Sequence, residues 1–330
     1  MTGPGMTHWE RVRATLKGEE TDRVPIALWR HWPPDDETPE GLAQVTLRWQ
    51  QTYDFDVVKA TPTGTYGIED WGGRTKYVSA DHGMRTVIKL GVTSPEGWPK
   101  LEPLDVSRGY LGNQIAAIRL VAGELRGRVP ILQTLFSPLT TARKLAGDRV
   151  FTHLRCNPEA LKAGLQTIAE THARFALESI RAGAHGIFYA TQCDSYQLLS
   201  EAEYREFGEV YDRIILDAVR PEAEIIMIHA HGHDIMFDLL ARYPADAINW
   251  HDRATPPSLT EAQARTSAML VGGINEWQTL LNGPCEAIRA EIREAIAQTG
   301  GRRFMVGPGC VVPINTSPLH VRAARDAVEG

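Results

Sequence analysis

Short apolar segments rich in β-branched residues alternate along the chain with longer amphipathic segments. The apolar segments are Val24–Trp29, Phe55–Ala60, Val129–Phe136, Gly186–Ala190, Glu224–Ile228, Ala247–Trp250, Met269–Ile274 and Phe304–Val306. Because most are continuous apolar runs without strict in/out alternation, they are typical of parallel strands covered on both faces. Eight such β/α units close most economically into a (β/α)8 TIM barrel, which is the fold we predict.

The chain has 330 residues, which exceeds the roughly 250 that such a barrel needs. Two segments account for the surplus. Thr7–Leu16 is amphipathic and predicts an N-terminal helix, and the Gly- and Trp-rich segment Thr61–Pro95 predicts a β-hairpin inserted after the second strand. Since no linker, repeat or change of composition divides the chain, we expect one domain over residues 1–330.

Composition and charge narrow the function. The chain is 43% hydrophobic and 23% charged, with a net charge of −6, which excludes disordered and coiled-coil classes and argues against binding nucleic acid or an anionic membrane. The N-terminal residues resemble no signal peptide, and nowhere do about 18 apolar residues follow one another. Four cysteines without regular spacing fit a reducing compartment. We therefore expect a cytoplasmic protein that acts on a small molecule.

Functional residues of such a barrel are expected after the strands, where the loops of all units converge. Here polar side chains follow the predicted strands more densely than elsewhere. We assign substrate binding to Arg30, His31, Asp56, Tyr66 and Gln192, and catalytic roles to Asp56 and Asp194.

The clearest chemical signal is the pair His229 and His231 at the end of the fifth strand. Side chains of a strand repeat with period two, so both imidazoles point to the same side. Cys310, in a Gly-Pro-Gly-Cys turn after the eighth strand, is the best third ligand. Two neutral nitrogens and one thiolate suit Zn²⁺ and leave one position open in a catalytic site. The alternative is that His229 is a hydrogen-bonded core histidine and Cys310 a small apolar filler.

Two further assignments each have an alternative. Arg30 and His31 form a cationic clamp for a carboxylate or sulfonate, or else a salt bridge to the acidic run 35–37. Asp194 either accepts a hydrogen bond that fixes a histidine tautomer, or is a solvated loop carboxylate.

Asp56 stands among apolar neighbours, where an ionised carboxylate is costly unless it is paired. It is therefore a candidate functional acid, with an ion pair to Lys59 or Arg30 as the alternative. The chain has no GxGxxG, Walker, HExxH or GxSxG pattern. The motifs that usually indicate nucleotide-dependent redox enzymes, NTPases, zincins and serine hydrolases are therefore absent. The chain also has no DxHxxG pattern of a cobalamin-holding domain, so a corrinoid would have to arrive on another protein.

Three segments together resemble the uroporphyrinogen decarboxylase superfamily over nearly the whole chain. They are HWERVRATLKGEETDRVPIALW near the N-terminus, DSYQLLSEAEYREF from Asp194, and GRRFMVGPGCVVPINTSPLHVRAARDAV near the C-terminus. The resemblance implies a TIM barrel, in agreement with the strand count. It also implies one of two activities, a porphyrinogen decarboxylase without metal or a zinc methyltransferase that moves a methyl group between a corrinoid protein and a thiol.

The decarboxylase pattern matches only in part. Arg30 matches the first arginine of its Arg-Gln-Ala-Gly-Arg run and Asp56 its substrate-binding aspartate. Pro34, Lys144 and Cys310 stand where the second arginine, a tyrosine and a histidine belong. The resemblance is therefore nearer to the methyltransferase branch.

The methyltransferase branch has a His-x-Cys pair and a terminal cysteine; His229 and Cys310 match, while His231 replaces the middle cysteine. Fewer thiolates leave a harder zinc, so the candidate substrates include ones other than coenzyme M and even an oxygen nucleophile. We expect Zn²⁺ on His229, His231 and Cys310, an acceptor thiol at the open position, and a methylated corrinoid protein or a small methylated substrate as donor. The alternatives are a carboxy-lyase that uses Asp56 and Arg30, and a non-catalytic scaffold.

Overall fold

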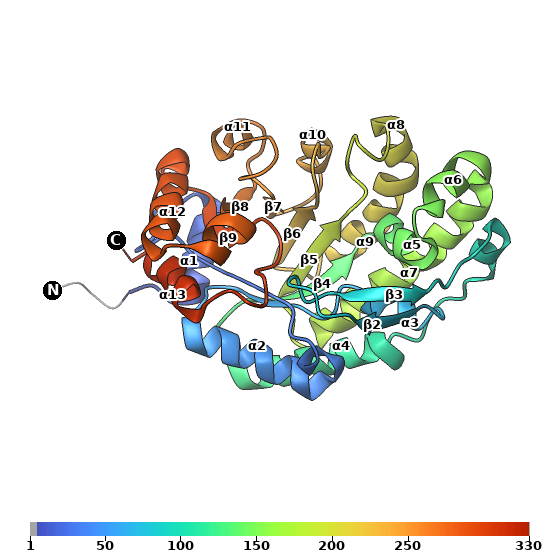
Figure 1. Ribbon diagram of the computed structural model, residues 1–330, viewed down its shortest axis with the longest axis horizontal. Helices are drawn as coiled ribbons and strands as arrows, with labels where there is room; N and C mark the ends of the chain where they lie inside the picture. The colour runs from blue at the N-terminus through green and yellow to red at the C-terminus, as the bar shows by residue number, and fades with distance from the viewer. Residues whose placement is uncertain (1–4, 330) are drawn as a thin grey trace.

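A curled parallel sheet surrounded by helices forms the body of the protein (Figure 1). The computed structural model describes residues 5–329. The strands of the sheet run in the order β1-β4-β5-β6-β7-β8-β9, and every neighbouring pair is parallel. Their bounds are β1 (Val58–Ala60), β4 (Ile131–Phe136), β5 (Gly186–Thr191), β6 (Ile225–Ala230), β7 (Ala247–Trp250), β8 (Met269–Ile274) and β9 (Phe304–Pro308). Seven of the eight expected strands are therefore present.

The remaining expected strand, Val24–Trp29, is an extended segment with one parallel bridge, Ile26 to Val306. The amide of Val306 donates to the carbonyl of Pro25 (2.9 Å), and the amide of Asp56 donates to the carbonyl of Ile26 (2.9 Å). Pro25 has no N–H to continue a ladder, which explains why the segment is shorter than a strand. Since it contacts both β9 and the residues before β1, it joins the two edges of the sheet, and the TIM-barrel prediction is confirmed.

The helices lie around the outside of the sheet, where their apolar faces cover the strands (Figure 1). They are α1 (His8–Lys17), α2 (Pro39–Tyr53), α3 (Tyr66–Glu69), α4 (Gly109–Leu125), α5 (Pro138–Ala146), α6 (Arg149–Cys156), α7 (Pro158–Arg181), α8 (Glu201–Tyr204), α9 (Val210–Val219), α10 (Phe237–Leu240), α11 (Leu259–Gln263), α12 (Cys285–Thr299) and α13 (Pro318–Asp326). Short turns of 3-10 helix are η1 (Asp35–Glu37) and η2 (Pro95–Lys100), and π-helical turns are η3 (Arg205–Glu209) and η4 (Glu276–Leu280).

Both predicted additions to the barrel are present. Helix α1 begins after Thr7, whose side chain accepts from the amide of Glu10 in a capping box, and it ends at Gly18 in the left-handed conformation. The insertion forms the antiparallel hairpin β2 (Arg74–Tyr77) and β3 (Arg85–Lys89). Within residues 5–329, no helix has the length and apolar character needed to span a bilayer.

Candidate metal centre

A cavity of about 240 Å³ lies at the carboxyl ends of the barrel strands. Aromatic side chains form much of its wall: Trp29, Phe136, Phe188 and Trp277. The hairpin contributes His82 and Met84, which lie between β2 and β3 in the sequence. The insertion therefore helps to enclose the cavity.

Four side chains that can bind a metal meet at this cavity. His229 belongs to β6, His231 follows β6, His251 follows β7, and Cys310 follows β9. One ligand atom from each lies within 4.8 Å of the others. The structure thus brings together the three residues that we predicted as ligands, and it adds His251.

Strand register explains why His251 joins the group. His229 pairs with Asn249 and Ala230 with Trp250 across β6 and β7, so the next step in register sets His231 opposite His251. The HxH spacing marks two ligands on one strand. It cannot reveal a ligand on the neighbouring strand, although the polar pair His251-Asp252 after the sixth predicted strand was a signal.

Asn249 fixes the orientation of His229. The Asn249 Nδ2 donates to the carbonyls of Val271 and Pro308, both at 2.9 Å, so its Oδ1 is the atom that faces the ring. The His229 Nδ1 must then donate to this oxygen (2.6 Å), which leaves Nε2 without a proton. A metal-binding histidine is typically held in this way, by a hydrogen bond from its other ring nitrogen.

Glu276 connects His251 with the turn that carries Cys310. Its Oε1 lies 3.4 Å from His251 Nδ1, and its Oε2 accepts from the amide of Gly309 (3.0 Å). A Cβ at position 309 would lie 3.0 Å from both His251 and Glu276, so only glycine fits without a shift. The approach of the Cys310 turn to His251 thus depends on Gly309.

The surroundings hold the imidazoles of His229 and His231 neutral. Burial, followed by the proximity of the other imidazoles, lowers the pKa of His229 well below its usual value. Burial and the nearby His251 lower the pKa of His231 to about 3. Burial raises the pKa of the Cys310 thiol to about 12, and Glu276 adds to this effect. His229 and His231 therefore have the form in which imidazoles bind metals, whereas the Cys310 thiol needs a cation to become a thiolate.

The donor set fits a zinc ion. Zinc prefers nitrogen and sulfur ligands in a tetrahedron, with Zn–N about 2.0 Å and Zn–S about 2.3 Å. The edge of such a tetrahedron between two nitrogens is about 3.3 Å. His251 Nε2 and His231 Nδ1 are 3.3 Å apart.

Among the residues expected to bind substrate, His31 and Gln192 line the cavity, whereas Arg30 does not. The Arg30 guanidinium lies 4.1 Å from the ring centroid of Trp32 and donates to the carbonyl of Ile314 (2.9 Å). It also forms no ion pair with residues 35–37 in the described chain; among these, Glu37 pairs with Arg85. Neither sequence interpretation of Arg30 therefore holds in the structure.

Tyr66 and Asp194 also lie away from the cavity wall. Tyr66 is buried in α3, and its hydroxyl donates to the carbonyl of Thr134 (2.7 Å). Asp194 is fully buried, so it is no solvated loop carboxylate; its pKa is raised by burial to about 7. Its carboxylate oxygens have no hydrogen-bond partner among residues 5–329, and Asn249 has the orienting role that we expected of Asp194.

Asp56 is at the other end of the barrel. It precedes β1, at the amino end of a parallel strand, while the cavity lies at the carboxyl ends. Its carboxylate accepts from Arg11 (2.6 Å), Arg23 (2.7 Å) and the amide of Ile26 (2.9 Å), and it lies 2.9 Å from His8 Nδ1. These contacts hold its pKa well below the usual range against the effect of burial. The ion pair expected as the alternative, to Lys59 or Arg30, does not form among the described residues; Asp56 pairs with Arg11 and Arg23 instead, and its assignment to the substrate site is not supported.

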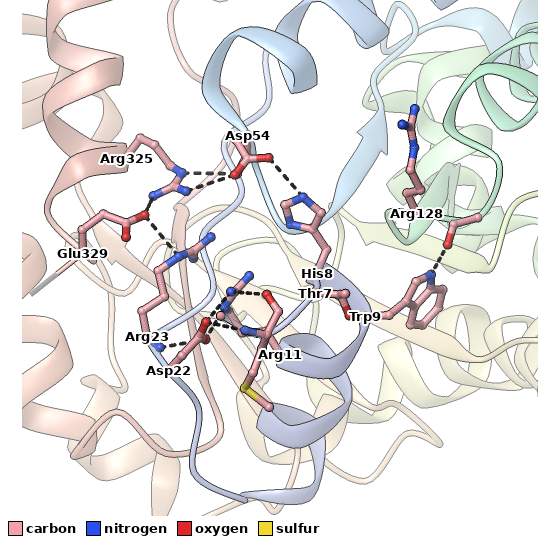
Figure 2. A pocket seen from close by; sticks show the side chains of 13 residues that line it. Thr7, His8, Trp9, Arg11, Asp22, Arg23, Asp54, Arg128, Arg325 and Glu329 are labelled. Atoms are coloured by element: carbon pink, nitrogen blue, oxygen red, sulfur yellow. Dashed lines mark hydrogen bonds and ion pairs between the residues drawn. The ribbon is translucent and has the colours of Figure 1, made fainter. Parts of the chain in front are cut away.

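A second cavity, of about 720 Å³, lies beside this ion-pair cluster (Figure 2). Most of its charged groups are paired with one another: His8 and Arg325 with Asp54, Arg11 with Asp22, and Arg23 with Glu329. Arg128, which also lines the cavity, donates to the backbone carbonyls of Leu125 and Glu124. The ion pairs around this cavity connect α1 and the C-terminal residues to the end of the barrel opposite the metal-binding side chains.

The fold and the donor set define a TIM barrel with a metal-capable centre at its mouth. The chain belongs to the uroporphyrinogen decarboxylase (URO-D) family, whose model matches residues 7–330. The methylcobamide:CoM methyltransferase MtbA of Methanosarcina mazei is 21% identical over 316 residues, covering 92% of each chain. The uroporphyrinogen decarboxylase of Azotobacter vinelandii is 27% identical over 307 residues, 88% of this chain and 83% of that one.

The fold has a close match among solved structures. A methyltransferase from Methanosarcina mazei superimposes with a TM-score of 0.85 at 22% identity, and 98% of each chain is covered. A B12-independent methionine synthase from Shewanella matches with a TM-score of 0.59 at 17% identity. These relatives are enzymes, and the resemblance to the methyltransferase branch is confirmed.

Proposed function

We propose that this protein is a zinc-dependent methyltransferase that moves a methyl group between a corrinoid protein and a small thiol. The meeting of His229, His231, His251 and Cys310 at one cavity carries the proposal. Zinc bound there would lower the pKa of a coordinated acceptor thiol and hold it as the thiolate, which is the competent nucleophile.

The residues of the chain have distinct tasks in this proposal. His229, His231 and Cys310 are the ligands expected from the sequence, and we assign His251 to the fourth position, from which the acceptor thiol would displace it. Asn249 holds His229 in one tautomer, and Glu276 positions both His251 and the Cys310 turn. The aromatic side chains of the cavity wall would limit the contact of water with a bound thiolate, which would strengthen its electrostatic contacts.

The partner assignment rests on likeness and on motifs. Methyltransferase relatives are named for a methylcobamide donor, and this chain lacks the DxHxxG pattern, so we assign the methyl donor to a separate corrinoid protein. His231 in place of a second thiolate favours an acceptor other than coenzyme M. A metal-binding Cys310 needs a reducing compartment, so we place the protein in the cytoplasm.

The decarboxylase alternative has lost its two supporting residues. Arg30 and Asp56 were its clamp and its anchor, and both lie outside the cavity. No other carboxylate-binding arginine lines this cavity in the described chain.

The test is a methyl-transfer assay from methylcobalamin to a panel of thiols, with zinc measured on the same samples. We expect one zinc per chain and transfer by the wild-type protein, and loss of both in Cys310→Ser. Cys285→Ser is the matched control, since Cys285 lies outside the cavity, at the start of α12. A zinc-loaded protein that transfers no methyl group to any thiol would contradict the proposal.

A further inference from the structure

His31 is a buried histidine in the wall of the cavity that holds the metal-binding side chains. Only 4% of the residue is exposed, and its Nδ1 has no hydrogen-bond partner among residues 5–329. A Cβ at Gly83 would lie 2.9 Å from the His31 Cβ, so the turn of the hairpin packs directly against the residue. A buried polar group without a partner is costly, and the space that the ring borders is the cavity. We therefore look for the partner of His31 in the ligand of this cavity.

The His31 imidazole is neutral. Burial, followed by the proximity of Lys59, lowers the pKa of His31 to about 3, and the carbonyl of Pro62 offsets only part of this effect. His31 is thus not the cation that the sequence suggested. A neutral imidazole has one N–H donor and one nitrogen that accepts, so the group that suits it best can both accept and donate a hydrogen bond.

Two further polar side chains of the wall are also uncharged. The amide of Met84 donates to His82 Nδ1 (2.9 Å), and a nitrogen that accepts carries no proton, so the His82 ring is neutral with its proton on Nε2. Gln192 has a neutral amide side chain. Together with His31, these residues offer hydrogen-bond donors and acceptors to a ligand without offering it a charge.

The lysines near the cavity do not require an acid on the acceptor. Lys59 lines the cavity, and the nearby Cys310 opposes the effect of burial, which lowers the pKa of Lys59 to about 7. Lys144 is not part of the wall, and its ammonium donates to the carbonyl of Gly64 (2.6 Å). In the proposed function, the positive charges of Zn²⁺ and Lys59 are balanced by the Cys310 thiolate, the Glu276 carboxylate and the acceptor thiolate. A second negative charge on the acceptor would upset this balance in buried surroundings, where an unpaired charge is costly.

We propose that the acceptor thiol carries an uncharged group that both donates and accepts hydrogen bonds, such as an amide, and that His31 is the specificity-determining residue that binds it. This inference deepens the proposed function and rests on it. The cavity has a volume of about 240 Å³, and the rings of Trp29 and Phe188 give its wall an apolar surface that suits methylene groups. A thiol and an amide joined by a short apolar linker fit these features.

The test compares three thiols of similar shape by calorimetric titration of the zinc-loaded protein: 3-mercaptopropionamide, 3-mercaptopropionate and 3-methylbutane-1-thiol. A neutral hydrogen bond contributes about 1 kcal/mol, which corresponds to about 5-fold in affinity. We expect the wild type to bind the amide at least about 5-fold more tightly than the carboxylate. The ratio of amide to alkyl affinity should fall about 5-fold in His31→Phe, which keeps a ring without polar atoms, while the zinc content is unchanged. His31→Gln has a donor and an acceptor and should retain part of the preference. Met84→Leu changes only an apolar part of the wall and is the matched control, which should keep the wild-type ratios.

The outcomes separate this inference from the function on which it rests. A zinc-loaded wild type that binds the carboxylate as tightly as the amide overturns the His31 proposal and leaves the zinc site intact. A folded His31→Phe protein that keeps the wild-type ratio of amide to alkyl affinity does the same. Should His31→Phe not fold, the ratios of the wild type and of His31→Gln decide. If the protein binds no zinc, the proposed function fails. Titration of the metal-free protein with propionamide and propionate then tests His31, and a protein that prefers propionate or binds neither overturns the proposal.

Discussion

An Asp56→Asn variant tests whether the Asp56 carboxylate stabilises the fold or takes part in catalysis. The Asp56 carboxylate is fully buried and pairs with Arg11 (2.6 Å) and Arg23 (2.7 Å), at the end of the barrel away from the cavity. The variant keeps the shape of the side chain and removes its charge. We therefore expect a loss of stability with no change in zinc binding or thiol affinity.

The size of the effect follows from the contacts. Removing one partner of a buried ion pair costs about 3–5 kcal/mol. Both arginines keep a second acid, since Arg11 pairs with Asp22 (2.7 Å) and Arg23 lies 3.3 Å from Glu329, so the lower value of about 3 kcal/mol applies. For 330 residues the entropy of unfolding is roughly 0.7 kcal/mol per kelvin, which makes the expected fall in Tm about 4 °C.

The assay is thermal unfolding of the zinc-loaded proteins, together with their zinc content. Asp54→Asn is the matched control, because Asp54 is 62% exposed although it contacts His8 and Arg325. Exposed ion pairs contribute at most about 1 kcal/mol, so its Tm should fall by about 1 °C or less. An Asp56→Asn protein with unchanged Tm and lost thiol binding would refute the assignment of Asp56 to the bottom of the barrel.

Three further expectations concern other parts of the molecule. Asn249→Ala removes the acceptor of the His229 Nδ1 proton and should weaken zinc affinity about 10- to 100-fold, as measured by chelator competition; unchanged affinity would exclude the orienting role. Gly309→Ala forces a Cβ to within 3.0 Å of His251 and Glu276, so zinc affinity should fall with little change in secondary structure by circular dichroism. Asp212 is buried among three tyrosine hydroxyls, and burial raises its pKa to about 6, so folding takes up a proton between roughly pH 4 and 6 and stability falls as pH rises through that window. Urea unfolding of Asp212→Asn should lack this fall, which in the wild type is about 3 kcal/mol, and an equal pH dependence of the two proteins would contradict the assignment.

The barrel could be predicted from the sequence because its strands are continuous apolar runs, and a parallel strand covered on both faces requires that pattern. The exception is Val24–Trp29, where Pro25 interrupts the ladder. Side chains of a regular strand alternate between its two faces, but this segment is not a regular strand. The direction in which the Arg30 side chain points could therefore not be predicted from the sequence.

Errors at the candidate site come from strand boundaries and from register. The second strand begins at Val58 and not at Phe55, which moves Asp56 from the interior of a strand to its amino end. His229 and His231 were found because both belong to one local pattern. His251, Asn249 and Lys59 were missed as site residues because each becomes informative only when the pairing of neighbouring strands is known.

Zinc K-edge X-ray absorption of the purified protein tests the central claim most directly. The account predicts one zinc per chain with imidazole nitrogens at about 2.0–2.1 Å and one sulfur at about 2.3 Å. Cys310→Ser should lose the zinc itself, whereas Cys285→Ser should keep both the zinc and its sulfur shell. A protein that binds no zinc, or a zinc shell without sulfur in the wild type, would contradict it.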